Sequence, residues 1–202
     1  MSSHHFVKEG QEPALLIIDT IPVGYIEPLL EWAPLVIVFD HSLDQVLQYG
    51  IKVDVVVAIT SDIGDLMNTL DHQMPVKVLS CLSGEDPVVK SLDFLTTTKQ
   101  SSVNIVTHHP DEIMHLIDRH RVGIDVSLIT STIRWSFIAS GEFRKWFPSG
   151  SNFRIRAESN VTINSNAGAI ALDLSGNEKT VDVPSDGIVS VKAGSGFWVG
   201  EE

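Results

Sequence analysis

The sequence predicts an α/β domain with a mainly parallel sheet, followed by a small all-β antiparallel domain. Over residues 13–148, short apolar runs alternate with longer amphipathic stretches, which is the rhythm of parallel strands joined by crossover helices. From Arg154 onward, apolar and polar residues alternate between clusters of Gly, Asn and Ser, as in short antiparallel strands joined by turns. We therefore expect two domains, 1–150 and 151–202, divided in the turn-forming segment after Phe147.

Short apolar runs, many of them rich in β-branched residues, are the expected strands of the first domain. Such runs are typical of parallel strands that are covered on both faces. They are residues 14–18, 35–39, 54–59, 76–81, 103–106 and 126–129. Helices are expected between them at residues 25–32, 42–49, 63–70, 87–95 and 111–121. Ser42, Asp62 and Asp86 stand where N-caps would begin three of these helices, and Gly50 stands where one would end.

The second domain is small for an independent fold. At about 50 residues it would bury little apolar surface alone, so we expect it to pack on the first domain or on a second subunit. Its strands are indicated by alternation such as that of Ile155, Ala157, Val161 and Ile163, interrupted by turn residues.

The charge balance limits the classes of partner. With 14 Lys and Arg against 26 Asp and Glu, the net charge is −12, which disfavours nucleic acid and anionic membrane surfaces. A small anionic ligand would need a local basic or backbone-amide site. The single cysteine, Cys81, cannot form an intrachain disulfide. No secretory signal or membrane-spanning run is found, so we expect a soluble, cytoplasmic protein.

Polar residues follow several of the expected strands, at the edge where parallel sheets bind ligands. These segments are Asp40-His41-Ser42, Thr60-Ser61-Asp62, Gly84-Glu85-Asp86 and Thr107-His108-His109-Pro110-Asp111. Clustered carboxylates are what a Mg²⁺–nucleotide site requires. The alternative is that such residues are ordinary helix caps, and the pattern alone favours this for Asp62 and Asp86.

Other motifs of nucleotide and hydrolase sites are absent from the sequence. It contains no glycine-rich phosphate loop and no G-x-S-x-G elbow. His108, His109 and Asp111 include Zn²⁺-ligand types, which leaves an unrelated α/β metal hydrolase as an alternative. The pattern favours a polar turn leading into a helix over a metal site, because two adjacent His side chains diverge.

Residues 36–63 read V-I-V-F-D-H-S, a helix, and then G-I-K-V-D-V-V-V-A-I-T-S-D-I. This segment resembles the thiamin pyrophosphokinase family. The family has a strand ending in D-G-G, a helix, and then G-I-K-P-D-x-x-I-G-D-x-D-S. The resemblance covers roughly residues 14–150 and extends more weakly over the rest of the chain. It lies in the order of the structural elements more than in the motifs themselves. It implies a nucleotide-binding-like first domain, a thiamin-binding-like second domain, a homodimer, and thiamin or a nucleotide as ligand.

The resemblance also assigns candidate site residues, with departures at the catalytic positions. Asp40 matches the D-G-G aspartate, while His41 and Ser42 replace its glycines. Ile59 and Ser61 stand where the Mg²⁺ aspartates belong, and Asp62 lies one place later. The implied catalytic residues are Asp40 and Asp62, and the implied Mg²⁺ ligands are Asp40, Asp62 and Asp86. The implied ATP-site residues are His41, Ser42, Ser61, Asp86, His108, His109 and Asp111.

Three functions are consistent with these residues. The first is pyrophosphate transfer from ATP to thiamin through shifted carboxylates, with Mg²⁺ as cofactor. The second is a non-catalytic protein of the same framework that binds a nucleotide, a thiamin compound or another small ligand. The third is the metal hydrolase. The family's glycine-rich G-G-R-x-D-H loop is replaced by Thr107-His108-His109-Pro110-Asp111-Glu112, which has no glycine or arginine. The loss of glycines, carboxylates and this loop arginine together favours reduced or absent kinase activity, because transfer needs Mg²⁺ and donors for the developing charge.

Overall fold

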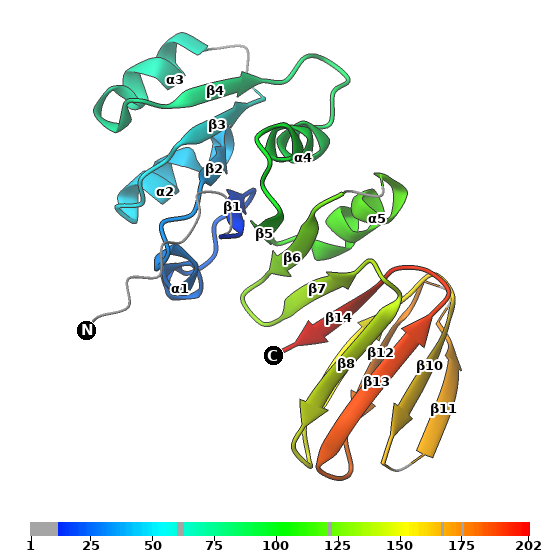
Figure 1. Cartoon of the computed structure of the whole chain (residues 1–202). Coiled ribbons are helices and arrows are strands. Elements are labelled where there is room, and N and C mark those ends of the chain that lie inside the picture. The colour runs from blue at the N-terminus through cyan, green and yellow to red at the C-terminus, as the bar shows by residue number, and fades with distance from the viewer. Residues whose placement is uncertain (1–11, 60–62, 121–122, 167, 175) are drawn as a thin grey trace, which may run out of the picture. The chain divides into compact units, whose positions relative to one another are not determined.

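The chain forms two compact units, Met1–Ser131 and Thr132–Glu202, which we call the N-terminal and C-terminal units (Figure 1). This computed structural model describes residues 12–59, 63–120, 123–166, 168–174 and 176–202. The division lies before the position near residue 150 that the sequence favours. The physical reason is that the two strands after Ser131 pair with strands near the C-terminus.

The N-terminal unit contains a parallel sheet, as the sequence predicts. Its strands are β1 (Ala14–Ile17), β2 (Val36–Phe39), β3 (Val55–Ala58), β4 (Lys77–Ser80), β5 (Ser102–Val106) and β6 (Asp125–Ile129). They lie in the order β6-β5-β1-β2-β3-β4, and every neighbouring pair is parallel. The central strand β1 is buried along its whole length, which explains its continuous apolar sequence.

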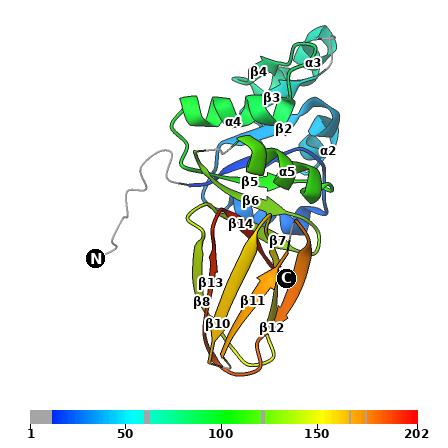
Figure 2. The same ribbon diagram turned by 90° about the vertical axis from the view of Figure 1, so that its right-hand side faces the viewer.

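Helices cover both faces of this sheet. They are α1 (Glu27–Leu30), α2 (Leu43–Gln48), α3 (Ile63–Thr69), α4 (Pro87–Thr97) and α5 (Pro110–His120), with 3-10 turns η1 (Val23–Tyr25), η2 (Asp40–Ser42) and η3 (Asp71–Gln73). Figure 2 shows α4 and α5 together on one face, and α2 lies on the other. On that second face, Val46 of α2 and Leu66 of α3 pack against Leu15 and Val38 of the sheet.

The C-terminal unit consists of antiparallel strands, also as predicted. They are β7 (Arg134–Ile138), β8 (Glu142–Phe147), β9 (Asn152–Arg156), β10 (Asn160–Ser165), β11 (Gly168–Asp173), β12 (Glu178–Asp182), β13 (Gly187–Ala193) and β14 (Phe197–Glu201). Within the unit, β12-β9-β14-β7 pair in that order, and β11-β10-β13-β8 form a separate sheet.

The two layers of the C-terminal unit share one apolar core. Phe153 of β9 and Phe197 of β14 come from one layer, and Phe147 of β8 and Val191 of β13 come from the other. The rings of Phe147 and Phe153 stack with their centroids 4.9 Å apart and their planes at 15°. The unit is therefore a small β-sandwich whose core is centred on aromatic side chains.

Among the helices of the described residues, none has the length and apolar character needed to cross a membrane.

Candidate functional site

The strand order of the N-terminal sheet identifies where a ligand would bind. The chain runs from β1 outward through β2, β3 and β4, and then returns to the other side of β1 to form β5 and β6. Ligands of such sheets bind beyond the carboxyl ends of the strands, beside the point where the strand order reverses. That point lies between β1 and β5, so the segments after β1, β2 and β5 are the candidates.

Asp19, just after β1, joins the ends of β1 and β5. Its Oδ2 accepts hydrogen bonds from the Thr107 hydroxyl at 3.0 Å and from the His108 backbone N–H at 2.9 Å. Burial raises the pKa of the Asp19 carboxyl, but these two hydrogen bonds and the nearby His108 and His109 outweigh it. The pKa of Asp19 is therefore below its ordinary value of 3.8, which favours the carboxylate.

Asp19 is a site residue that the sequence patterns did not single out. The signal was present, because Asp19 follows the first expected strand much as Asp40 follows the second.

Asp40 joins the carboxyl ends of β2 and β3. Its Oδ2 accepts the Ile59 backbone N–H at 2.7 Å, and its Oδ1 accepts the His41 backbone N–H at 2.8 Å. The His41 ring lies between the two carboxylates, with Nε2 3.7 Å from Asp19 Oδ1 and Nδ1 3.9 Å from Asp40 Oδ1. The structure thus brings Asp40 and His41 together with Asp19 at the expected edge.

Two other predicted residues have structural partners. The Ser42 side chain does not cap α2, so that expectation is wrong: its buried hydroxyl donates to the Ile18 carbonyl at 2.7 Å instead. Asp86 caps α4, because its Oδ1 accepts the Val88 and Val89 backbone N–H groups at 2.8 and 3.1 Å. The interpretation of Asp86 as a helix cap is therefore confirmed.

The segment after β5 contributes backbone N–H groups to the hydrogen bonds around Asp19 and Thr107. The His109 N–H donates to the Thr107 hydroxyl at 3.0 Å, while the His108 N–H reaches Asp19. Asp111 lies in the first turn of α5. Within the described part of the chain, no three His, Cys, Asp or Glu side chains gather closely enough to hold a metal ion. Ser61 and Asp62 lie outside the described residues.

Asp40 and Asp86, the two described residues among the three implied Mg²⁺ ligands, do not by themselves fit Mg²⁺. Asp40, the best-matched candidate ligand, already accepts backbone N–H groups on both of its carboxylate oxygens. Asp86 uses one carboxylate oxygen for two bonds at the start of α4. Mg²⁺ prefers several oxygen ligands in an octahedral arrangement, which these two carboxylates do not supply.

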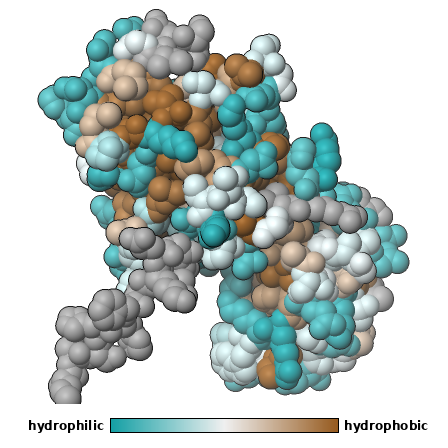
Figure 3. Space-filling model, turned by 45° about the horizontal axis from the view of Figure 1, so that its top comes forward, coloured by the Kyte–Doolittle hydropathy of each residue, from teal (hydrophilic) through white to brown (hydrophobic). Residues whose placement is uncertain are grey.

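A hollow of about 610 Å³ lies beside Asp40 and His41, between α2 and α3. Asp40, Asp44 and Asp65 give it three carboxylates, while Leu43, Ile59 and Leu66 give it an apolar wall. Among the described residues that line it, none is Lys or Arg. Figure 3 shows apolar atoms reaching the surface of the N-terminal unit among hydrophilic ones. This combination suits an organic cation with an apolar body.

The lowered pKa of Asp19 predicts an acid-dependent stability. A carboxyl whose folded pKa is depressed stabilises the fold above its unfolded pKa, and the contribution is lost as pH falls through the folded pKa. We expect Thr107→Val, which removes one donor to Asp19, to lower the free energy of unfolding at neutral pH. The difference from wild type should shrink below about pH 3.8. Urea denaturation across pH measures it, and a pH-independent difference would contradict the assignment.

Comparison with known proteins identifies solved structures with a similar fold. No family model matches the sequence, and the search of curated proteins found no match. Among solved structures, thiamine pyrophosphokinase from Bacillus subtilis is 13% identical with a TM-score of 0.63, covering 93% of this chain and 97% of that chain. Thiamin pyrophosphokinase from Geobacillus thermodenitrificans is 8% identical with a TM-score of 0.67, covering 93% and 95%. The yeast thiamin pyrophosphokinase is 7% identical with a TM-score of 0.66, covering 95% and 86%. The chain therefore has the fold of the thiamin pyrophosphokinases.

Proposed function

We propose that this protein binds a small organic cation in the hollow beside Asp40 and His41, and that it does not transfer pyrophosphate. Thiamin, which carries a cationic thiazolium ring, is the ligand that the fold suggests. The observation that carries the proposal is the lining of the hollow, where three carboxylates accompany an apolar wall and no described Lys or Arg is present.

Electrostatics favours a cation over a nucleotide at this position. Asp40, Asp44 and Asp65 surround the hollow in a chain of net charge −12. Like charges raise the free energy of a bound polyphosphate, whereas a positively charged ring is attracted by the same field. Within the apolar wall, Ile59 is the accessible side chain, at 48% exposed, and it would contact the uncharged part of such a ring.

Pyrophosphate transfer has weaker support in the described residues. Charge that develops on the transferring group must be stabilised by metal ions, cationic side chains or aimed N–H groups. At the end of β2 and β3, the nearby backbone N–H groups of His41 and Ile59 are taken by Asp40. The His41 side chain adds bulk beside Asp19 and Asp40, where the resembling family has a glycine that would let the backbone approach a phosphate.

The second candidate is a thiamin pyrophosphokinase, an enzyme that transfers pyrophosphate from ATP to thiamin with Mg²⁺ as cofactor. The names of the neighbouring structures favour it. Asp40 and Asp62 would supply its catalytic carboxylates, and the enzyme would be a cytoplasmic homodimer.

Calorimetric titration of thiamin into the full chain tests the first candidate. We expect saturable binding that Asp44→Lys weakens about tenfold, because a charge at the rim changes from attractive to repulsive. Asp93→Lys is the matched control, since it makes the same charge change on the exposed side of α4, away from the hollow. Equal weakening by both variants, or no binding by the wild type, would reject the site.

A turnover assay separates the two candidates. The protein is incubated with thiamin, ATP and Mg²⁺, and thiamin diphosphate is followed by fluorescence after oxidation. We expect no product above the control without protein. Product that disappears in Asp40→Asn would establish the enzyme and contradict the non-transferring binder.

A further inference from the structure

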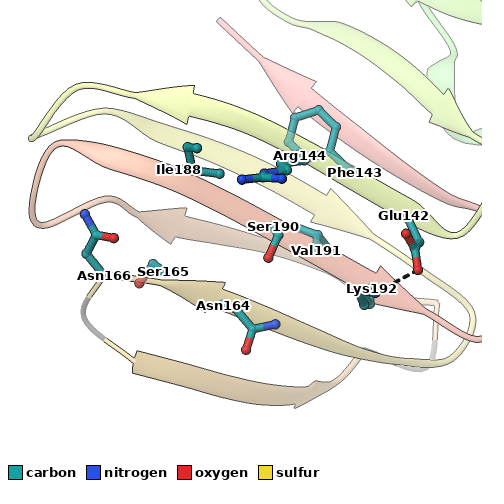
Figure 4. Close-up of a pocket in the computed structure, with 10 residues that line it drawn as sticks. All are labelled: Glu142, Phe143, Arg144, Asn164, Ser165, Asn166, Ile188, Ser190, Val191 and Lys192. Carbon is teal, nitrogen blue, oxygen red and sulfur yellow. Dashed lines mark hydrogen bonds and ion pairs between the residues drawn. The ribbon is translucent and has the colours of Figure 1, made fainter.

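A second hollow lies in the C-terminal unit, on the sheet β11-β10-β13-β8. It measures about 650 Å³ and is lined by side chains of β8, β10 and β13 (Figure 4). On β13, Val189 and Val191 are buried in the sandwich, whereas Ile188 and Lys192 are exposed. Since side chains alternate along a strand, Ile188, Ser190 and Lys192 share the outer face, away from the core.

Three polar side chains form a row across this outer face. Ser190 of β13 pairs with Arg144 of β8 on one side and with Asn164 of β10 on the other. Residues directly opposite each other in antiparallel strands project from the same face. A guanidinium, a hydroxyl and an amide therefore stand in one line, and all three groups can donate hydrogen bonds.

The rows on either side differ in character. On one side, Trp146 pairs with Ile188, and both are unusually exposed for large apolar side chains, at 57% and 43%. On the other side, Lys192 donates to Glu142 at 2.8 Å. Figure 4 shows Arg144 extending toward Ile188 and away from the Glu142–Lys192 pair. Across this face there is thus first an apolar row, then a row of hydrogen-bond donors, and then the oppositely charged pair Glu142–Lys192.

Arg144 is the group that indicates the ligand's charge. Lys145, Arg154 and Lys192 of the same unit each have a carboxylate partner. Within the described residues, Arg144 has no such ion pair, although the chain carries a net charge of −12. A planar guanidinium facing a hollow matches a carboxylate with two parallel hydrogen bonds.

We propose that this outer face binds a small aromatic carboxylate. The carboxylate would lie against Arg144, with hydrogen bonds from Ser190 and Asn164, and the ring would rest on Ile188 and Trp146. This site has the opposite charge preference to the hollow of the N-terminal unit and goes beyond the proposed function. An aromatic ring is favoured because exposed apolar area adjoins the donors in the next row.

Calorimetry with 2-naphthoate as the probe tests the site on the full chain. We expect saturable binding that Arg144→Gln weakens about tenfold or more, because a charge-assisted pair is lost. Lys179→Gln, on the exposed side of β12, is the control with the same charge change and should leave the affinity unaltered. The uncharged analogue 2-naphthamide should bind weakly to wild type and equally weakly to Arg144→Gln.

Other results would overturn the proposal. These are the absence of saturable binding at millimolar probe, equal affinity in Arg144→Gln, or 2-naphthamide binding as tightly as 2-naphthoate. Sedimentation velocity tests a competing occupant, a second copy of the chain. If the wild type is a dimer that Ile188→Asp dissociates, this face is a subunit interface and the ligand site is rejected.

Discussion

The Phe153→Ala variant is expected to lose about 3–5 kcal/mol of unfolding free energy, the usual cost of removing a fully buried aromatic ring. Phe153 is 1% exposed and belongs to the sandwich core. Its ring stacks on Phe147 and also lies 6.5 Å from the Phe143 ring, centroid to centroid. A cavity at that position would remove contacts from both layers of the C-terminal unit, because Phe143 and Phe147 come from the opposite sheet.

Urea denaturation followed by tryptophan fluorescence measures this loss. The signal reports mainly on the C-terminal unit, since Trp135, Trp146 and Trp198 lie there and only Trp32 lies in the other unit. Ile188→Ala is the control, because Ile188 is exposed and its truncation should cost less than about 0.5 kcal/mol. A loss below about 1 kcal/mol for Phe153→Ala would contradict the described core.

Asp40→Ala should destabilise the N-terminal unit by about 2 kcal/mol, because two charge-assisted hydrogen bonds are lost together. The Asp40 side chain is only 12% exposed and holds the backbone at the ends of β2 and β3. Asp40→Asn keeps one oxygen acceptor and should cost less. Thiamin binding should weaken in both variants, since each removes a carboxylate from the hollow.

Far-UV circular dichroism during urea denaturation measures the stability of the Asp40 variants. Asp44→Ala serves as the control, because Asp44 lines the same hollow but is exposed and makes no described bond to β2 or β3. If Asp40→Ala were as stable as Asp44→Ala, the structural role given to Asp40 would be wrong.

The architecture was predictable because strand and helix signals are local. The apolar runs at β1, β2 and β3 are buried on both faces, and that burial is visible in their composition. The division between the units was not predictable in the same way. Phe147-Pro148-Ser149-Gly150 is a strong local turn, but β7 and β8 belong with β14 and β13, and such pairing is set over long distances.

The residues of the candidate site were likewise predictable only where the signal is local in the sequence. Asp40 and His41 were identified because they follow a strand directly. Asp19 was missed because its partner Thr107 lies 88 residues away, and only the adjacency of β1 and β5 brings them together. The apolar wall of the hollow was also missed, since Leu43 and Leu66 look like ordinary core residues of their helices.

The position of β14 bears on how the protein forms during synthesis. In its layer β14 pairs with β7 on one side and β9 on the other, although both of those strands are made earlier. During translation, the edges of β7 and β9 that pair with β14 therefore stay unpaired until the segment Phe197–Glu201 has left the ribosome. The N-terminal unit, whose strands end with β6, can complete its sheet well before then. The C-terminal unit is thus the part whose unpaired strand edges most need protection while translation is unfinished.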